Sequence, residues 1–339
     1  MRNFFTTGSK PVTDWKQEAE TAVEAVRTAA RLCRSVQSSL APDVLEKRDR
    51  SPVTVADFGS QAVICRMLGD RFPDDPIVAE EDAAALRGGE NRAFLDRVCT
   101  ELQAIGQSGS EEEVCSWIDR GGVREYSKRF WTLDPIDGTK GFLRKEQYAV
   151  SLALIVEGQI TVAAVACPNL PLSGDDSDST GVIFSATRRA GCRTVPQDET
   201  KTSSSDRVGV TANDNPGDAR FTESVESGHT SHSHAADVAA ALGITREPLR
   251  MDSQAKYAVV ARGDADIYLR LPTKPGYQEK IWDHAGGALI VEEAGGRVTD
   301  VEGKPLDFTR GRELSANRGV IVSNGLLHDR VLAAVKQAL

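Results

Sequence analysis

A short apolar segment that ends in two carboxylates constrains the fold of this chain more than any other feature of its sequence. Phe130-Trp131-Thr132-Leu133 has the aromatic and β-branched character of a buried strand, and it leads directly into Asp134-Pro135-Ile136-Asp137-Gly138-Thr139. Because Pro135 lacks an N–H and has a restrained φ, we expect a shaped corner here and not a continuing strand. Two carboxylates around such a corner can share one cation.

The residues after this corner are suited to an anionic ligand. Gly138 allows the backbone to approach a ligand closely, and Thr139 offers a hydroxyl group. If a helix begins here, its first N–H groups can bind a phosphate. An isolated Asp in a turn usually has no role beyond the turn itself. The prediction of a cation site at this corner therefore depends also on the acidic residues elsewhere in the chain.

Regular elements are predicted on the N-terminal side of the corner. The apolar period favours helices at residues 14–40 and from Phe58 to just before Pro73. Extended segments are predicted at 51–57 and 77–79, and the second delivers Glu80. Residues 83–130 are polar and only partly helical, with an exposed loop at 107–113.

Strands and helices alternate on the C-terminal side. A hairpin is predicted at 148–166 around Glu157-Gly158-Gln159, followed by solvated loops at 173–180 and 196–206. We expect two domains, residues 1–180 of α+β type and residues 181–339 of α/β type. In the second, strands are predicted at 208–211, 266–271 and 319–322, and helices at 234–242, 283–293 and 326–339.

Five acidic residues stand at the ends of these predicted elements, where functional side chains are usually presented. They are Asp57, Glu80, Asp134, Asp137 and Asp283. Oxygen ligands, and carboxylates above all, suit hard cations such as Mg²⁺. The set therefore points to a magnesium site.

Composition excludes several classes of partner. The net charge of −9, from 41 Lys and Arg against 50 Asp and Glu, argues against a protein that coats a nucleic acid polymer. No apolar run approaches the roughly 18–20 residues of a membrane span. Because six cysteines form no CxxC pair and no signal-peptide core is present, we expect free thiols in a reducing compartment, the cytoplasm. An organelle is the alternative if a transit peptide is missing. We also expect a monomer.

Asp134 to Phe142 resembles the signature of the lithium-sensitive, Mg²⁺-dependent phosphatases, the superfamily of inositol monophosphatase. Trp282 to Gly287, followed by Glu293 to Gly296, resembles its second signature. Ala79-Glu80-Glu81 is similar to its Gly-Glu-Glu element, with Ala in the place of Gly. The resemblance implies an α/β fold, a layered αβαβα sandwich with the active site between two domains.

Further segments resemble the bisphosphate nucleotidase branch of this superfamily. They are Gly141 to Arg144, Val225 to His229, Asp252 to Tyr257, Tyr268 to Pro272 and Tyr277 to Asp283. This branch implies hydrolysis of the 3′-phosphate of adenosine 3′,5′-bisphosphate to AMP and phosphate. It also implies action on 3′-phosphoadenosine 5′-phosphosulfate and a secondary activity on inositol 1,4-bisphosphate.

The resemblance assigns roles residue by residue. One Mg²⁺ would be bound by Glu80, Asp134 and the Ile136 carbonyl, a second by Asp134, Asp137 and Asp283, and a weaker third near Glu80 and Asp57. Asp57 and Thr139 would activate the attacking water, with Thr139 as the relay and Asp57 as the base. The remaining substrate contacts are implied for Gly138, His229, Ser253, Lys256, Arg270 and Asp283.

Other interpretations remain open at this stage. His229, His232 and His234 could suggest a Zn²⁺ or Ni²⁺ site, but a polar loop with a helix start near Ser233 explains them as well. An inositol phosphatase is the nearest rival enzyme, and a non-catalytic sensor of adenosine bisphosphates is a rival of another class. No GxGxxG, GxxxxGK[ST] or GxSxG string is present.

Overall fold

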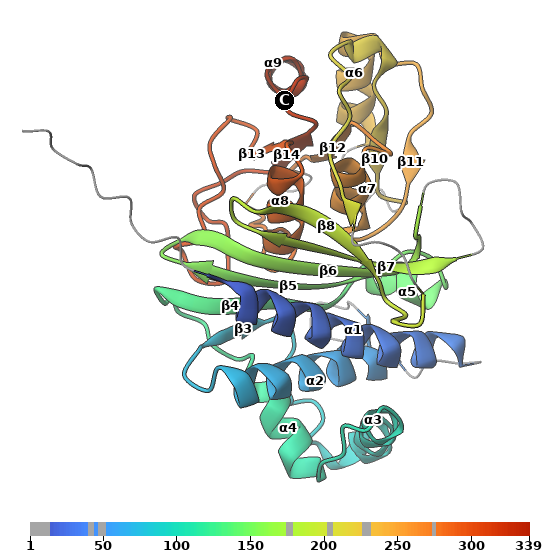
Figure 1. Cartoon of the computed structure of the whole chain (residues 1–339), viewed down its shortest axis with the longest axis vertical. Helices are drawn as coiled ribbons and strands as arrows, with labels where there is room; N and C mark the ends of the chain where they lie inside the picture. The colour runs from blue at the N-terminus through green and yellow to red at the C-terminus, as the bar shows by residue number, and fades with distance from the viewer. Residues whose placement is uncertain are drawn as a thin grey trace, which may run out of the picture.

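Helices and sheets alternate in five layers, as the sequence predicted (Figure 1). The computed structural model describes residues 14–39, 44–46, 52–173, 179–201, 206–225, 232–272 and 276–339. Two helices cover a seven-stranded sheet, two more separate it from a five-stranded sheet, and a last pair covers that second sheet.

The first layer is built from α1 (Lys16–Ser38) and α2 (Val55–Arg71), with α3 (Arg92–Ala104) and α4 (Glu111–Asp119) packed outside α2. The predicted long amphipathic helix is confirmed as α1, although Leu40 lies outside the described residues. A Cβ added to Gly59 of α2 would lie 2.9 Å from both terminal carbons of Leu32. A glycine at this position therefore lets the two helices approach closely.

The start of α2 corrects the extended segment predicted at 51–57. Strand β2 (Pro52–Thr54) pairs with β1 (Val44–Glu46) and already ends at Thr54. The Thr54 side chain accepts a hydrogen bond from the Ala56 N–H, and the Asp57 carboxylate accepts one from the Thr54 N–H at 2.7 Å. This capping box starts the helix three residues early, so Asp57 lies in its first turn.

The second layer is the seven-stranded sheet, whose strands follow chain order. Its strands are β3 (Ile77–Ala79), β4 (Arg129–Asp137), β5 (Ala149–Val156), β6 (Gln159–Pro171), β7 (Thr180–Thr187), β8 (Gly191–Pro196) and β9 (Asp206–Arg207). Among these described strands, β3 and β4 form the only parallel pair. The predicted hairpin is confirmed as β5–β6, where Glu157 and Gly158 have positive φ values of 50° and 78°.

The third layer, α7 (Ala255–Arg262) and α8 (Ala285–Glu293), lies between the two sheets. Close approach of α8 requires glycine at two positions. An added Cβ would lie 2.2 Å from Ser151 Oγ at Gly286 and 2.3 Å from Tyr257 Cγ at Gly287. These glycines set α8 directly against β5 and α7.

The last two layers are the five-stranded sheet, in the order β11-β10-β12-β14-β13, and the outer helices α6 (His232–Leu242) and α9 (His328–Ala338). The strands are β10 (Phe221–Glu223), β11 (Leu249–Arg250), β12 (Ile267–Arg270), β13 (Arg297–Thr299) and β14 (Val320–Ser323). Short helices are α5 (Thr139–Leu143), η1 (Gly89–Asn91) and η2 (Pro216–Asp218). The seven-stranded sheet continues past residue 180 to Arg207, and the division into two domains stays a prediction.

Two local expectations are wrong. The loop predicted at 107–113 ends early, because the Ser110 side chain accepts from the Glu113 N–H and caps α4 at Glu111. Residues 208–211 form no strand: Val208 donates to the Cys192 carbonyl and Val210 to the Ala294 carbonyl, so these bonds do not form a ladder with one partner strand.

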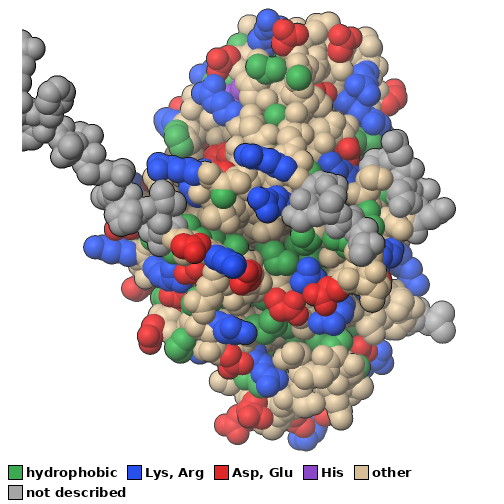
Figure 2. Space-filling model, viewed as in Figure 1, with side chains coloured by type: hydrophobic (Ala, Val, Ile, Leu, Met, Phe, Trp, Pro, Cys, Tyr) green, Lys and Arg blue, Asp and Glu red, His purple; other side chains and the backbone are tan. Residues whose placement is uncertain are grey.

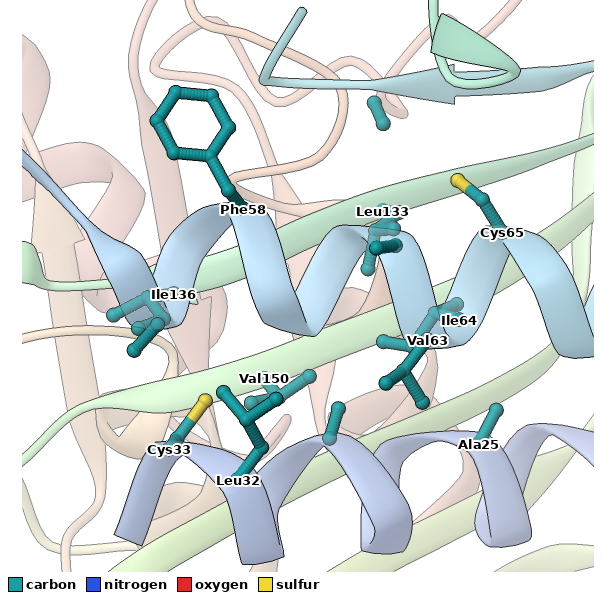
Figure 3. Close-up of a cluster of buried hydrophobic side chains, with 14 of the residues drawn as sticks. Ala25, Leu32, Cys33, Phe58, Val63, Ile64, Cys65, Leu133, Ile136 and Val150 are labelled. Carbon is teal, nitrogen blue, oxygen red and sulfur yellow. The ribbon is translucent and has the colours of Figure 1, made fainter. Parts of the chain in front are cut away.

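Apolar side chains fill both faces of the seven-stranded sheet. Figure 3 shows part of the cluster on the α1–α2 side of the sheet, which includes Leu32 of α1, Phe58 of α2, and Leu133 and Ile136 of β4. Along β5, Leu152 and Leu154 belong to this cluster, whereas Ala153 and Ile155 belong to the cluster on the α7–α8 side. Burial on both faces explains why β5 is apolar at every position except Ser151.

The surface carries both signs of charge. On the face shown in Figure 2, basic and acidic side chains alternate over the described residues.

All six cysteines are unpaired, and Cys99 is the only one that is not buried. Among the described helices, none combines the length and the apolar character that crossing a membrane requires.

Candidate metal and active site

The ends of β3 and β4 bring the first two predicted ligands together. Ala79 pairs with Leu133 in the parallel ladder, so Glu80 and Asp134 follow side by side at the same edge. Asp134 is buried and Glu80 is half-buried. Two acidic residues that are far apart in the chain thus become neighbours through strand register alone.

A β-bulge carries the chain from Asp134 to Asp137. Asp134 pairs with Ser151 and Asp137 with Ala149, so one extra residue is inserted on β4. The Ser60 hydroxyl of α2 donates to the Pro135 carbonyl at 2.8 Å and anchors the bulge to that helix. The expectation that the strand ends at Leu133 and gives way to a corner is therefore wrong: the strand continues to Asp137 because a bulge accommodates Pro135.

The predicted catalytic pair lies together. Thr139 Oγ1 is 3.4 Å from Asp57 Oδ1 and 3.3 Å from the Ile136 carbonyl. The other oxygen of Asp57 accepts from the Thr54 N–H and, at 2.6 Å, from the Thr54 hydroxyl. One Asp57 oxygen is thus held in the capping box while the other faces Thr139. A helix does begin at Thr139: it is the short α5, preceded by Gly138 with a φ of 86°.

Asp137 and Asp283 share a crowded acidic environment. Burial raises the pKa of Asp137; the charges of Lys256 and Arg270 lower it in part, and that of Glu80 raises it further. Burial also raises the pKa of Asp283, opposed by Arg270 and reinforced by Asp137 and Glu80. These carboxylates are close enough to repel one another, and a cation among them would relieve that repulsion. The donors are all oxygen atoms, which fits a hard divalent ion such as Mg²⁺.

Two predicted substrate-binding cations converge on this cluster. Lys256 of α7 is buried with its Nζ 3.3 Å from the Met251 carbonyl, and burial lowers its pKa to about 8. Arg270 at the end of β12 places a guanidinium nitrogen 3.8 Å from Asp283 Oδ2. The positive charges of both residues lower the pKa of Asp137. The structure therefore places near one another three residues whose spacing in the sequence did not show that they are close.

The other predicted substrate residues are partly accounted for. Ser253 has a φ of 72°, and a Cβ added to Gly138 would lie 3.0 Å from the Ser253 Cβ, so these two residues are in contact. His229 lies outside the described residues. The alternative histidine site gains no support from the described residues: α6 begins at His232, close to the helix start predicted near Ser233.

A buried polar chain behind Arg270 was not recognised in the sequence. Tyr257 Oη lies 2.7 Å from His284 Nδ1, and His284 Nε2 lies 3.2 Å from Glu279 Oε2. Glu279 accepts from Arg270 Nε at 3.2 and 3.1 Å. Burial raises the pKa of Glu279, but the hydrogen bond from His284 and the charge of Arg270 outweigh it and lower the pKa to about 2.

This series of hydrogen-bonded side chains orients the Arg270 guanidinium. Side-chain atoms of Glu279, Asp283 and His284 lie within 4.8 Å of one another, a spacing that also suits a metal ion. In this structure the cation that Glu279 binds is the Arg270 guanidinium, and both ring nitrogens of His284 are engaged. We therefore interpret Glu279 and His284 as the support of Arg270, while Asp283 remains a predicted metal ligand. All three residues were in motifs quoted from the sequence, but only Asp283 was given a role.

Comparison with known proteins places this chain in the family that its sequence motifs resemble. Residues 14–339 match the inositol monophosphatase family. A 3′(2′),5′-bisphosphate nucleotidase of Schizosaccharomyces pombe is 48% identical over 94% of this chain and 94% of its own length. One of Emericella nidulans is 43% identical over 96% and 99%, and a 3′,5′-bisphosphate nucleotidase 2 of Arabidopsis thaliana is 42% identical over 96% and 97%.

Solved structures share the fold. An IMPase of Thermotoga maritima matches with a TM-score of 0.67 at 22% identity, covering 95% of this chain and 98% of its own. The suhB protein of Bartonella henselae matches with a TM-score of 0.65 at 20% identity, covering 94% and 98%. At these identities the likeness concerns the fold alone.

Proposed function

This chain is a phosphatase of the inositol monophosphatase family, and from that premise we propose that it hydrolyses the 3′-phosphate of adenosine 3′,5′-bisphosphate to AMP and phosphate. The observation that carries the proposal is the convergence of Lys256 and Arg270 beside the acidic cluster. A substrate with two phosphates needs cations for the group that is retained as well as a metal site for the group that is cleaved.

The 5′-phosphate is assigned to these two cations. The fork of Arg270 suits two phosphate oxygens, and Glu279 holds it in orientation. Lys256 adds a point charge from α7, and a bound phosphate dianion would favour its charged form. Ser253, Gly138, Thr139 and Asp283 line the space between this pair and the cleaved group in our proposal, and His229 is retained from the sequence.

The metal site is assigned to oxygen donors from three elements. The carboxylates of Glu80, Asp134, Asp137 and Asp283 and the Ile136 carbonyl would hold two or three Mg²⁺ ions. Bound Mg²⁺ supplies Lewis-acid stabilisation of the phosphoryl and leaving oxygens and lowers the pKa of a coordinated water.

The removal of a proton from the attacking water is assigned to Thr139, as the relay, and to Asp57, as the final acceptor. The Thr139 hydroxyl lies within reach of Asp57 Oδ1, so it can receive a proton from water while passing its own to the carboxylate. Thr54 binds Asp57 Oδ2 through two donors and leaves Oδ1 directed at Thr139. The capping box therefore orients the base.

The same arrangement extends the substrate range. Because the 5′ group is bound and not cleaved, 3′-phosphoadenosine 5′-phosphosulfate should also be accepted. Inositol 1,4-bisphosphate, with two separated phosphates, is a secondary substrate in this proposal.

A direct comparison of substrates tests the assignment. Phosphate release with Mg²⁺ would be measured for adenosine 3′,5′-bisphosphate, inositol 1,4-bisphosphate and inositol 1-phosphate. We expect kcat/KM to be highest for the nucleotide. A preference for an inositol phosphate would leave the metal site in place but contradict the roles of Lys256 and Arg270. No turnover of any of the three would favour the non-catalytic sensor.

A further inference from the structure

One buried amide side chain connects the elements that carry the predicted metal ligands. Gln254 precedes α7 and is 1% exposed. Its backbone N–H donates to Asp137 Oδ2 at 2.6 Å, and its Nε2 donates to the Trp282 carbonyl at 2.9 Å. Its Oε1 accepts from the Ser151 hydroxyl at 3.0 Å and from the Gly287 N–H at 2.9 Å. The three side-chain bonds are buried, and the backbone bond to Asp137 is partly buried.

Three of the four partners of Gln254 are a predicted ligand or a residue that neighbours one in the chain or across the sheet, and the fourth, Gly287, lies in the first turn of α8. Asp137 is itself a predicted ligand, and Trp282 directly precedes Asp283 in the chain. Ser151 on β5 is the cross-strand partner of Asp134. A single residue is therefore hydrogen-bonded to the bulge of β4, to β5, and to the start of α8.

The segment that presents Gln254 is held firmly. Ser253 adopts a left-handed φ of 72°, a conformation that a non-glycine residue keeps only when its surroundings enforce it. On its N-terminal side, the Asp252 carboxylate accepts from the Arg144 guanidinium and from the Val225 N–H. On its C-terminal side are the four hydrogen bonds of Gln254. An enforced backbone of this kind is typical of functional sites.

The chemistry of the position calls for an amide. The side chain must accept two hydrogen bonds at one atom and donate one at the other, which Asn and Gln can do and an ionised Asp or Glu cannot. Asn would be too short by one carbon to reach the same partners. A Glu side chain would lose the bond to the Trp282 carbonyl and would add a negative charge to an already acidic cluster.

We propose that Gln254 is a positioning residue that sets the spacing between Asp137 and Asp283 and so determines the affinity of the metal site that they share. This inference rests on the proposed metal role of the two aspartates. Groups that orient metal ligands typically change metal affinity or activity by roughly 10–100-fold when they are replaced.

The test compares two variants that remove equivalent buried amides. Gln254→Met keeps the side-chain length and removes its three side-chain hydrogen bonds. Asn324→Leu does the same far from the acidic cluster: Asn324 is 2% exposed, and its side chain bonds the Thr211 hydroxyl, the Asn213 carbonyl and the Leu327 N–H. Asn324 follows the Ser323 end of β14, whereas Arg270 pairs with Val320 at the other end.

Metal affinity would be measured without substrate, by electron paramagnetic resonance of free Mn²⁺, beside the thermal midpoint of each protein. We expect both variants to lose stability, but only Gln254→Met to weaken Mn²⁺ binding, by about 10–100-fold. Wild-type affinity in Gln254→Met, or equal weakening in both variants, would overturn the proposal.

A milder variant covers the case in which Gln254→Met does not fold. Ser151→Ala removes one hydrogen bond to Gln254 Oε1 and should weaken Mn²⁺ binding by a smaller factor in the same direction. Unchanged Mn²⁺ affinity in Ser151→Ala would then overturn the proposal. Because Mn²⁺ binding requires no substrate, a wild-type protein that binds Mn²⁺ but does not cleave the nucleotide contradicts the proposed substrate and leaves this inference intact.

Discussion

Lys256 provides a test of the substrate site through pH. Burial lowers the pKa of this lysine from 10.5 to about 8, with the charges of Asp137 and Asp252 opposing the shift. A lysine of this pKa is roughly nine-tenths charged at pH 7 and one-tenth charged at pH 9. Raising the pH therefore removes the cation, and a substrate that depends on it should bind more weakly.

The comparison of two substrates isolates this effect. Adenosine 3′,5′-bisphosphate carries the 5′-phosphate assigned to Lys256, whereas adenosine 3′-monophosphate lacks it. Dividing the two kcat/KM values cancels the effects of pH on the metal and on the attacking water, and above about pH 7 both phosphates are largely dianionic. We expect the ratio to fall by about tenfold between pH 7 and pH 9.

A matched variant supplies the control. Lys256→Met keeps an unbranched side chain of similar length and has no charge to lose, so its ratio should be lower at pH 7 and independent of pH. A flat profile in the wild type would refute the reasoning, since the 5′-phosphate would then not depend on Lys256. The same fall in Lys256→Met would place the titrating group elsewhere.

Four other expectations concern the metal, the base, the core and lithium. Asp134→Asn should lose Mn²⁺ binding and phosphate release together; full activity in this variant would contradict the site. Thr139→Ala should lower kcat by about 100-fold while Thr139→Ser keeps most of it, because only the hydroxyl relays the proton. Leu32→Ala, at a fully buried position, should cost about 2–5 kcal/mol in urea unfolding, whereas Leu326→Ala, at a side chain 60% exposed, should cost little. Millimolar Li⁺ should inhibit phosphate release, and the degree of inhibition should depend on the Mg²⁺ concentration if both ions use one site. Activity that is insensitive to Li⁺ would weaken the assignment of the metal site.

The regular elements were largely predictable because their patterns are local. The stripe of small and apolar residues in α1 and the two apolar runs around Glu157 and Gly158 indicate a helix and a hairpin without any tertiary information. The errors arose where a single side chain changes the backbone. Thr54 and Ser110 each cap a helix, and the caps replaced an extended segment and a loop with helical turns.

The candidate site was predictable in part, for the same reason. Pro135 and the carboxylates on either side of it lie in one short segment, so they were recognisable as a unit, although the bulge that lets the strand continue was not. Gln254 and Glu279 carried no signal of their own. Their importance lies in partners that are distant in the chain, and a buried Gln or Glu is distinguished from an exposed one only by packing.

The amino-acid sequence on its own determined the chemical content of this protein: oxygen donors at the ends of strands, a hydroxyl after a glycine, and the family signatures. These depend on residue type and on short-range chain geometry, which a sequence contains directly. Only the tertiary structure decided that Asp283, Lys256 and Arg270 meet Asp137. The meeting depends on strand register, on Gly286 and Gly287 letting α8 approach β5 and α7, and on the hydrogen bonds of Gln254, all of which are contacts between segments far apart in the chain.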